Sequence, residues 1–382
     1  MIRKRYFIFI LVSTLTFIGS ISSQKYCVTQ ACNDTARTFI YNMNNSVDPC
    51  NDFYQFACGG FVNKTVFPPG ESQVNIFSEL TTLLNNQMKT LLERNSTNKD
   101  IRPFVLVRNF YQACMNETAI ETVGLKPLQE MLSRLGGWLD TKENDDVLTK
   151  GTKYNWTSDL KKLRDHGYST KFLMHIDISQ DLSNYSRMSL FLDKPEFGIY
   201  RNALVKGRGD FEVEAYFQYM KDAAVLLGHN FSEVEENLEN ILNFEIQMAN
   251  LTKSNDEISN LTDLNNKMQI KNLTTLNPCI PWLQYINSLL KINQVQKEDD
   301  IIVYEPSYIS GLYTLMKNSS LKVVKDYVRW RVIESSIPYL NKAAQNISNV
   351  FYEKLFGTTS EKERYMTCID LVSEELNHPV GA

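Results

Sequence analysis

The residues that could hold a catalytic metal are few and lack the spacing of a metal site. The four histidines are His166, His175, His229 and His378. A zinc-peptidase helix carries two histidines four residues apart, because that spacing places both imidazoles on one helix face. No two of these histidines have this separation. The sequence therefore predicts no zinc and no other cofactor within this chain, and each histidine is expected on the surface or in a strand.

Cysteine is the second residue type that could do chemistry here. Cys50 and Cys58 have seven residues between them, no Cys-x-x-Cys pair and no histidine nearby, which is a poor match to zinc-ligand spacing. Disulfides are the natural use of cysteine in an oxidising compartment. The count is odd, so at least one thiol has no partner within this chain. The seven cysteines are Cys27, Cys32, Cys50, Cys58, Cys114, Cys279 and Cys368.

Other functions receive little support. No Gly-x-Ser-x-Gly sequence marks a nucleophilic serine. Arg208-Gly209-Asp210 has the form of an adhesion motif, but it lies in a glycine-containing loop before a predicted helix, where such residues suit a turn. The 40 Lys and Arg residues nearly balance the 44 Asp and Glu residues, with no basic run after the first five residues. Nucleic acid is therefore not expected as a partner.

The first residues have the features of a secretory signal. Three basic residues precede an apolar run from Tyr6 to Ile21, and small residues follow. The run contains polar residues and is shorter than the roughly 20 apolar residues of a membrane-spanning helix. We expect residues 1–23 to be a signal peptide, with an uncleaved signal-anchor as the alternative. The protein is then secreted, or it is a type II ectoprotein of the plasma membrane with an amino-terminal membrane anchor.

Acceptor sites for N-linked glycans run along the whole chain and support the same compartment. They predict a glycoprotein whose acceptor asparagines lie on the surface. The predicted sites are Asn33, Asn44, Asn63, Asn95, Asn116, Asn155, Asn184, Asn230, Asn250, Asn260, Asn272, Asn318 and Asn346.

Helical periodicity dominates the rest of the sequence, and 43% hydrophobic residues suffice for a large core. An apolar stripe over residues 76–91 predicts a helix that packs on the core, and residues 211–227 predict a second one. Ser232 and Glu235 form a capping-box pattern before a third helix. A helical region over residues 308–355 is expected to be interrupted at Pro338.

Strands are expected in two places. Residues 172–178 alternate in polarity and predict a β-hairpin with residues 188–192, and residues 301–304 predict another strand. We expect a mostly α fold, in one domain over residues 24–382.

A family resemblance lies in residues 46–61, which read Ser-Val-Asp-Pro-Cys-Asn-Asp-Phe-Tyr-Gln-Phe-Ala-Cys-Gly-Gly-Phe. This segment resembles the amino-terminal signature of the neprilysin and endothelin-converting-enzyme family of zinc metallopeptidases. Similar segments follow in the family's order over residues 26–382. They are Cys27-x4-Cys32, Tyr111–Glu117, Gly136–Trp138, Phe244-Glu245, Pro281–Leu283 and Tyr327–Arg331.

The resemblance implies a large helical cap lobe from the amino-terminal part of a peptidase that hydrolyses small peptides. The thermolysin-like catalytic lobe, with His-Glu-x-x-His and its zinc, is missing from these residues. The chain alone is then expected to be inactive, as a fragment of the enzyme, and its partners would be that lobe and small peptides. The alternative is a stand-alone module that binds peptides or a partner without hydrolysis.

The resemblance also implies a cysteine pattern. Cys27 would pair with Cys32 and Cys114 with Cys368, Cys50 and Cys58 would bond to the catalytic lobe, and Cys279 is left over. If residues 51–57 are helical, Cys50 and Cys58 are separated by a rise on the order of 12 Å. They could not then form a disulfide with each other.

One further position concerns substrate binding. By alignment, Gln73 occupies the place of a cap arginine that meets a substrate carboxylate in such enzymes. Glutamine offers neutral donors where arginine offers a charged fork. Gln73 is thus a candidate substrate-binding residue, or else an ordinary residue at the entry of a helix.

Overall fold

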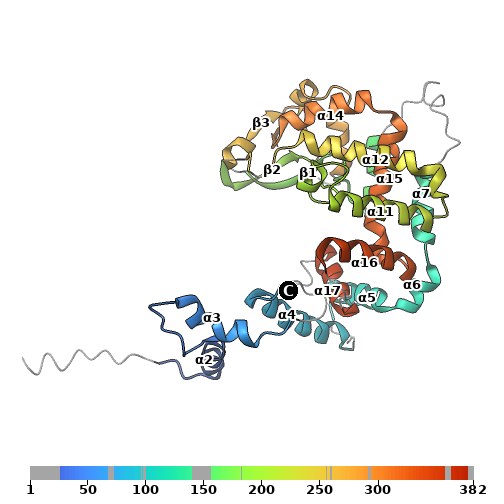
Figure 1. The fold of residues 1–382 in the computed structure, drawn as a ribbon. Helices are drawn as coiled ribbons and strands as arrows, with labels where there is room; N and C mark the ends of the chain where they lie inside the picture. The colour runs from blue at the N-terminus through green and yellow to red at the C-terminus, as the bar shows by residue number, and fades with distance from the viewer. Residues whose placement is uncertain are drawn as a thin grey trace, which may run out of the picture. The chain divides into compact units, whose positions relative to one another are not determined.

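The structure is a computed structural model, and it divides the chain into two compact units, residues 1–68 and 69–382 (Figure 1). It describes residues 26–67, 73–95, 97, 100–139, 156–181, 183–254, 256–258, 260–290, 294–357 and 363–376. The predicted signal segment lies outside the described residues. The fold is mostly α with a small sheet, as the sequence predicts.

The first unit contains a helical hairpin. Helix α2 (Gln30–Asn42) begins after Thr29, and α3 (Phe53–Lys64) begins after Asp52, whose carboxylate accepts from the amide of Gln55 and caps the helix. The two helices pack closely at Gly60, where an added Cβ would lie 2.5 Å from the carbonyl oxygen of Met43. The described part of this unit buries Gly59 and Gly60 but no apolar side chain. The hairpin therefore has no hydrophobic core of its own.

The second unit contains two hydrophobic cores, of which the smaller joins three helices. These are α4 (Ile76–Glu93), α5 (Arg102–Met115) and α17 (Arg364–Glu375). The Cys114–Cys368 disulfide lies within this core, beside Tyr111 and Ile369. The bridge therefore joins α5 to α17 through two cysteines that are 254 residues apart in sequence.

The larger core is made by the remaining helices. α11 (Phe211–Leu226) packs beside α16 (Lys342–Phe356), and α12 (Phe231–Leu251) packs beside α15 (Leu321–Ser336). The other elements of the second unit are α6 (Glu117–Val123), α7 (Lys126–Arg134), α9 (Trp156–Asp165), α10 (Arg201–Leu204), α13 (Trp282–Leu289), α14 (Pro306–Asn318) and the 3-10 turns Leu261–Leu264, Ile270–Thr275 and Ile337–Tyr339.

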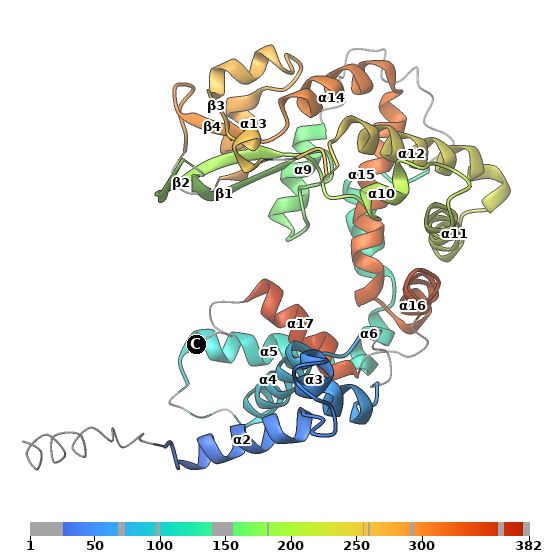
Figure 2. The same ribbon diagram turned by 60° about the vertical axis from the view of Figure 1, so that its left-hand side comes forward.

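A four-stranded sheet in the order β1-β2-β4-β3 lies at the end of this body away from α11 and α16 (Figure 2). Strands β1 (His175–Asp181) and β2 (Asn184–Asp193) form the predicted hairpin. β4 (Asp300–Val303), also predicted, pairs parallel to β2 and antiparallel to β3 (Asn266–Gln269). β3 was not predicted, because four residues without alternating polarity give too little pattern.

Two local predictions were wrong. Ser232 forms no capping box: the residue before α12 is Asn230, two residues earlier than predicted, and the hydroxyl of Ser232 donates to Asn230. The 308–355 region breaks at Ser319 and Ser320 as well as at Pro338, because Ser320 caps a new helix. A helix over residues 51–57 was the condition for separating Cys50 from Cys58, and it is met only from Phe53 onward.

Candidate functional site

The apolar face of α4 lies open to solvent, which contradicts the expectation that it packs on the core. Phe77 is 79% exposed and Leu83 is 55% exposed. The helix packs instead through Met88 and Leu92, and its polar residues contact α17: the hydroxyl of Tyr365 donates to Asn86, 3.3 Å away. The exposed apolar residues of α4 are Ile76, Phe77, Leu80, Leu83, Leu84 and Leu91, here called the α4 face. Such an apolar stripe makes the α4 face a candidate interaction surface.

Gln73 lies three residues before α4. It is exposed and precedes Asn75, which caps the helix through the amide of Ser78. Its position at a helix entry is as expected. A contact between Gln73 and substrate stays a prediction.

The first unit carries further exposed apolar side chains, on both of its helices. Phe39 and Ile40 are exposed on α2, and Phe53 and Tyr54 are exposed on α3. Cys50, just before α3, is a free, exposed cysteine, and Cys58, within α3, is also free and only partly covered. Both thiols are thus accessible to a bonding partner.

Two of the family-like segments meet inside the large core as a network of buried charges. The Nη1 atom of Arg331, on α15, lies 3.3 Å from Oε1 of Glu245, on α12. Arg331 Nε also pairs with Glu334 at 3.0 Å. Glu245 accepts from the hydroxyl of Tyr216 and the amide of Gly198. The network ties α11, α12, α15 and the segment before α10 together.

The electrostatics of the network follow from burial and from the sharing of one cation. Burial raises the pKa of Glu334, and the nearby Glu245 adds to the increase while Arg331 opposes it. Burial alone would lower the pKa of Arg331, but Glu334 and Glu245 hold it well above its ordinary value. Arg331 therefore stays charged. Since the network is enclosed and fully engaged, it positions helices and offers no group for catalysis.

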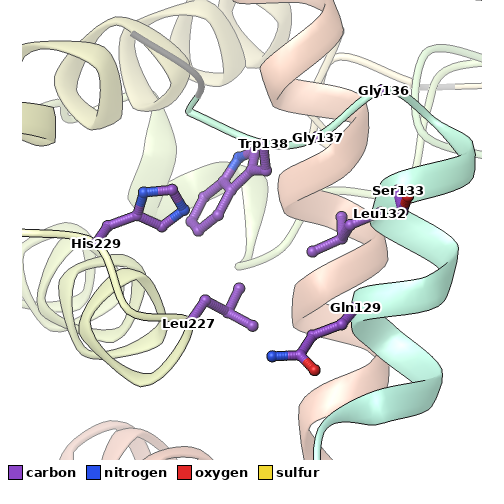
Figure 3. A pocket seen from close by; sticks show the side chains of 8 residues that line it. All are labelled: Gln129, Leu132, Ser133, Gly136, Gly137, Trp138, Leu227 and His229. Carbon is purple, nitrogen blue, oxygen red and sulfur yellow. The ribbon is translucent and has the colours of Figure 1, made fainter.

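A hollow of about 370 Å³ lies between the ends of α7 and α11. Trp138 and His229 approach each other there, with ring centroids 5.7 Å apart, and Gln129 and Leu132 come from α7 (Figure 3). Gly136 and Gly137 form the turn that ends α7, with positive φ. The family-like Gly136–Trp138 segment is therefore a structural turn, whose tryptophan also stacks on Trp330.

Comparisons with known proteins identify the family. A model described as Peptidase family M13 matches residues 49–382. The chain belongs to peptidase family M13. It is 30% identical over 352 residues to Neprilysin-2 of Drosophila melanogaster, which covers 92% of this chain and 45% of that protein. It is 28% identical over 378 residues to Endothelin-converting enzyme 1 of Homo sapiens, which covers 97% of this chain and 48% of that protein.

Solved structures show the same fold. The Mycobacterium tuberculosis zinc metalloprotease ZMP1 in complex with an inhibitor superposes with a TM-score of 0.73 at 16% identity, over 89% of this chain and 50% of that one. PEPO from Lactobacillus rhamnosis gives a TM-score of 0.73 at 15% identity, over 88% and 51%. The chain thus spans about half the length of the M13 relatives that it matches.

M13 peptidases depend on zinc, which is held by a group of several His, Cys, Asp or Glu side chains. Among them, no three His, Cys, Asp or Glu side chains are placed to hold a metal. His166 is held by Arg134 and the carbonyl of Lys162, and His175 lies on β1 beside Asp177. His378 lies outside the described residues. The described residues therefore do not fit a zinc ion.

The structure contains the two disulfides that the resemblance implies within this chain. Cys27–Cys32 and Cys114–Cys368 are disulfides, with Cα atoms 5.9 and 5.7 Å apart. Cys279 is free and exposed.

Of the thirteen predicted glycan acceptors, Asn155 lies outside the described residues. Asn44 is half-buried, and the other described acceptors are exposed. Glycosylation itself stays a prediction.

The adhesion motif is engaged within its own loop. The guanidinium of Arg208 pairs with Glu214 at 2.8 Å and lies over the ring of Phe217. Asp210 caps α11 and pairs with Lys206 at 2.8 Å. An integrin-type partner would have to break these contacts.

Proposed function

We propose that this chain is the amino-terminal part of a zinc metalloendopeptidase that hydrolyses small peptides outside the cell. In this proposal the catalytic residues come from sequence beyond these 382 residues, and the chain alone is inactive. Family M13 membership supports the reaction class. The coverage of about half of each relative supports a catalytic part elsewhere.

The α4 face is the observation that carries the proposal of a catalytic-lobe partner. Burial of apolar area contributes on the order of 25 cal/mol per Å², so an uncovered stripe of six large apolar side chains is a strong site for association. The hairpin of the first unit, which lacks a core, supports the same idea. Cys50 and Cys58 would then bond to that lobe.

Two features of the chain support the proposed extracellular compartment. Exposed acceptor asparagines and two disulfides both suit an extracellular protein. None of the described helices has both the length and the apolar composition needed to cross a bilayer. The protein could be secreted or anchored through its first residues. Amino-terminal sequencing of the protein from medium and from membranes distinguishes these two forms.

The transcript beyond the codon for Ala382 tests the proposal. We expect an in-frame continuation that encodes His-Glu-x-x-His. The protein expressed from it should cleave a quenched fluorescent peptide, lose activity with a chelator, and lose it when the glutamate of that motif becomes glutamine. A stop codon after Ala382 in full-length messages would contradict the proposal and favour the stand-alone module. A clean monomer with Cys50 and Cys58 joined would do the same.

A further inference from the structure

Arg329, on α15, is buried with most of its guanidinium unpaired. Only 1% of the residue is exposed. Its Nη2 atom donates to the carbonyl of Leu135, which follows the last residue of α7. Nε and Nη1 have no hydrogen-bond partner among the residues that the structure describes. Since Nε carries one N–H group and Nη1 carries two, three donors of a buried cation are unmet.

The carboxylates of its own helix do not neutralise this cation. The acidic residues of α15 are Asp326 and Glu334. Asp326 pairs with Lys322 at 2.6 Å, and Glu334 pairs with Arg331 at 3.0 Å. Arg329 forms an ion pair with neither of them, nor with another acidic side chain of the described residues. A buried charge is costly unless it is paired and hydrogen-bonded, so this position favours an anion.

The hollow beside α7 comes close to this guanidinium. Gly136 lines the hollow and is exposed, and a Cβ added to it would lie 3.6 Å from Nη2 of Arg329. Its φ of +86° favours glycine, so no side chain stands at this position. Helix α15 packs beside α7 and runs behind the turn in Figure 3. The guanidinium therefore lies directly behind the glycine turn that forms this side of the hollow.

The lining of the hollow suits a small organic anion. Its volume of about 370 Å³ lies in the range of small-molecule sites, roughly 300–1,000 Å³. The amide of Gln129 points into it (Figure 3), and no acidic side chain of the described residues lines it. Glu130, the acidic neighbour of Gln129, pairs with Lys126 at 3.9 Å. The apolar side chains of the lining are Leu132, Trp138 and Leu227.

We propose that this hollow binds a small organic anion, with its carboxylate on Arg329 and its apolar group against Trp138 and Leu227. Carboxylate oxygens accept strong, charge-assisted hydrogen bonds from a guanidinium. The turn at Gly136 and Gly137 has to shift to admit the carboxylate, and glycine gives the backbone the freedom to do so. The inference goes beyond the peptidase proposal, because the site needs neither zinc nor a catalytic lobe.

A pair of matched ligands tests the preference with the chain as it is. The probe is 4-phenylbutyrate, a carboxylate on an apolar group, and its match is 4-phenylbutanamide, which has the same length and no charge. Ligand-observed NMR titrations should show about tenfold tighter binding of the carboxylate. Equal binding of the two ligands would overturn the proposal by showing an apolar hollow only. Binding of neither would also overturn it, since water would then meet the donors of Arg329.

Variants locate the site. Arg329→Gln removes the charge and should weaken 4-phenylbutyrate binding about tenfold, with little effect on the amide. Gln129→Glu changes an exposed residue, so it should fold normally, and its negative charge should weaken carboxylate binding about three- to tenfold. Melting temperatures identify a variant that has unfolded, and Gln129→Glu decides if Arg329→Gln has done so.

Gln247→Glu is the matched control. It makes the same change at an exposed position of α12, sixteen residues after Phe231, which is about 24 Å along the helix at 1.5 Å per residue. It should leave the binding of both ligands unchanged. Unchanged carboxylate binding by Gln129→Glu, or by a folded Arg329→Gln, would overturn the assignment of the site.

Discussion

Arg331 on α15 lies 3.3 Å from Glu245 on α12, and both side chains are buried. The two residues come from family-like segments more than eighty residues apart, and the structure joins them in one ion pair. Tyr216, Glu334 and the carbonyl of Glu196 complete the network. Four separate parts of the large body therefore depend on one guanidinium.

Arg331→Met should destabilise the chain by about 3–5 kcal/mol, because it leaves two buried carboxylates without their cation. Urea unfolding followed by tryptophan emission measures this. Adding Glu245→Gln to Arg331→Met should cost less than the sum of the two single changes, since the pair is coupled. Arg37→Met is the control: its exposed pair with Asp34 should contribute under about 1 kcal/mol. Additive effects in the double variant would show that the pair is not coupled.

Two substitutions on α4 should distinguish its exposed face from its buried contacts with the small core. Leu83→Glu should leave the melting temperature of the isolated chain nearly unchanged and reduce its self-association, because Leu83 belongs to the open α4 face. Leu92→Ala should cost about 2–5 kcal/mol, because Leu92 is buried in the small core. Sedimentation velocity and thermal unfolding measure the two effects. A large loss of stability with Leu83→Glu would show that this face is covered in the isolated chain.

The two disulfides should contribute unequally. The Cys114–Cys368 bridge closes a loop with a sequence separation of 254 and the Cys27–Cys32 bridge one of 5, so the long bridge restricts the unfolded chain more. Replacing Cys114 and Cys368 by alanine should lower the free energy of unfolding by about 3–5 kcal/mol, against about 2 kcal/mol or less for Cys27 and Cys32. Non-reducing peptide maps of the wild type should contain both bridges. A Cys50–Cys114 link would contradict this pattern.

Asp100 should make stability fall in acid. The amide of Thr97 and the guanidinium of Arg108, 2.7 Å away, lower its pKa from 3.8 to about 2. Because the pKa of Asp100 is lower in the folded state than in the unfolded state, ionised Asp100 stabilises the fold above about pH 4. This stabilisation is lost as the pH falls towards 2. The stability difference between wild type and Asp100→Asn should therefore be constant above pH 4 and shrink below it. Urea unfolding midpoints at pH 7, 4, 3 and 2 measure this stability difference. A difference that grows below pH 4 would contradict the prediction.

The sequence by itself determined the elements with strong local signals. The β1–β2 hairpin follows from alternating polarity, and α4 and α11 follow from helical periodicity, because these patterns reflect which face of an element meets apolar surroundings. The amino-acid sequence of residues 46–61 was enough to indicate the family. The cysteine partners also came from that resemblance, since spacing alone left them open.

Tertiary structure decided what those faces meet. The stripe on α4 was identified from sequence, but not that it lies open while Leu92 and Asn86 make the contacts. Periodicity shows that a face is apolar, not which partner covers it. The Arg331–Glu245 pair joins residues from distant segments, and β3 gains its conformation by pairing with β4. Such contacts are long-range, so no local pattern in the sequence encodes them.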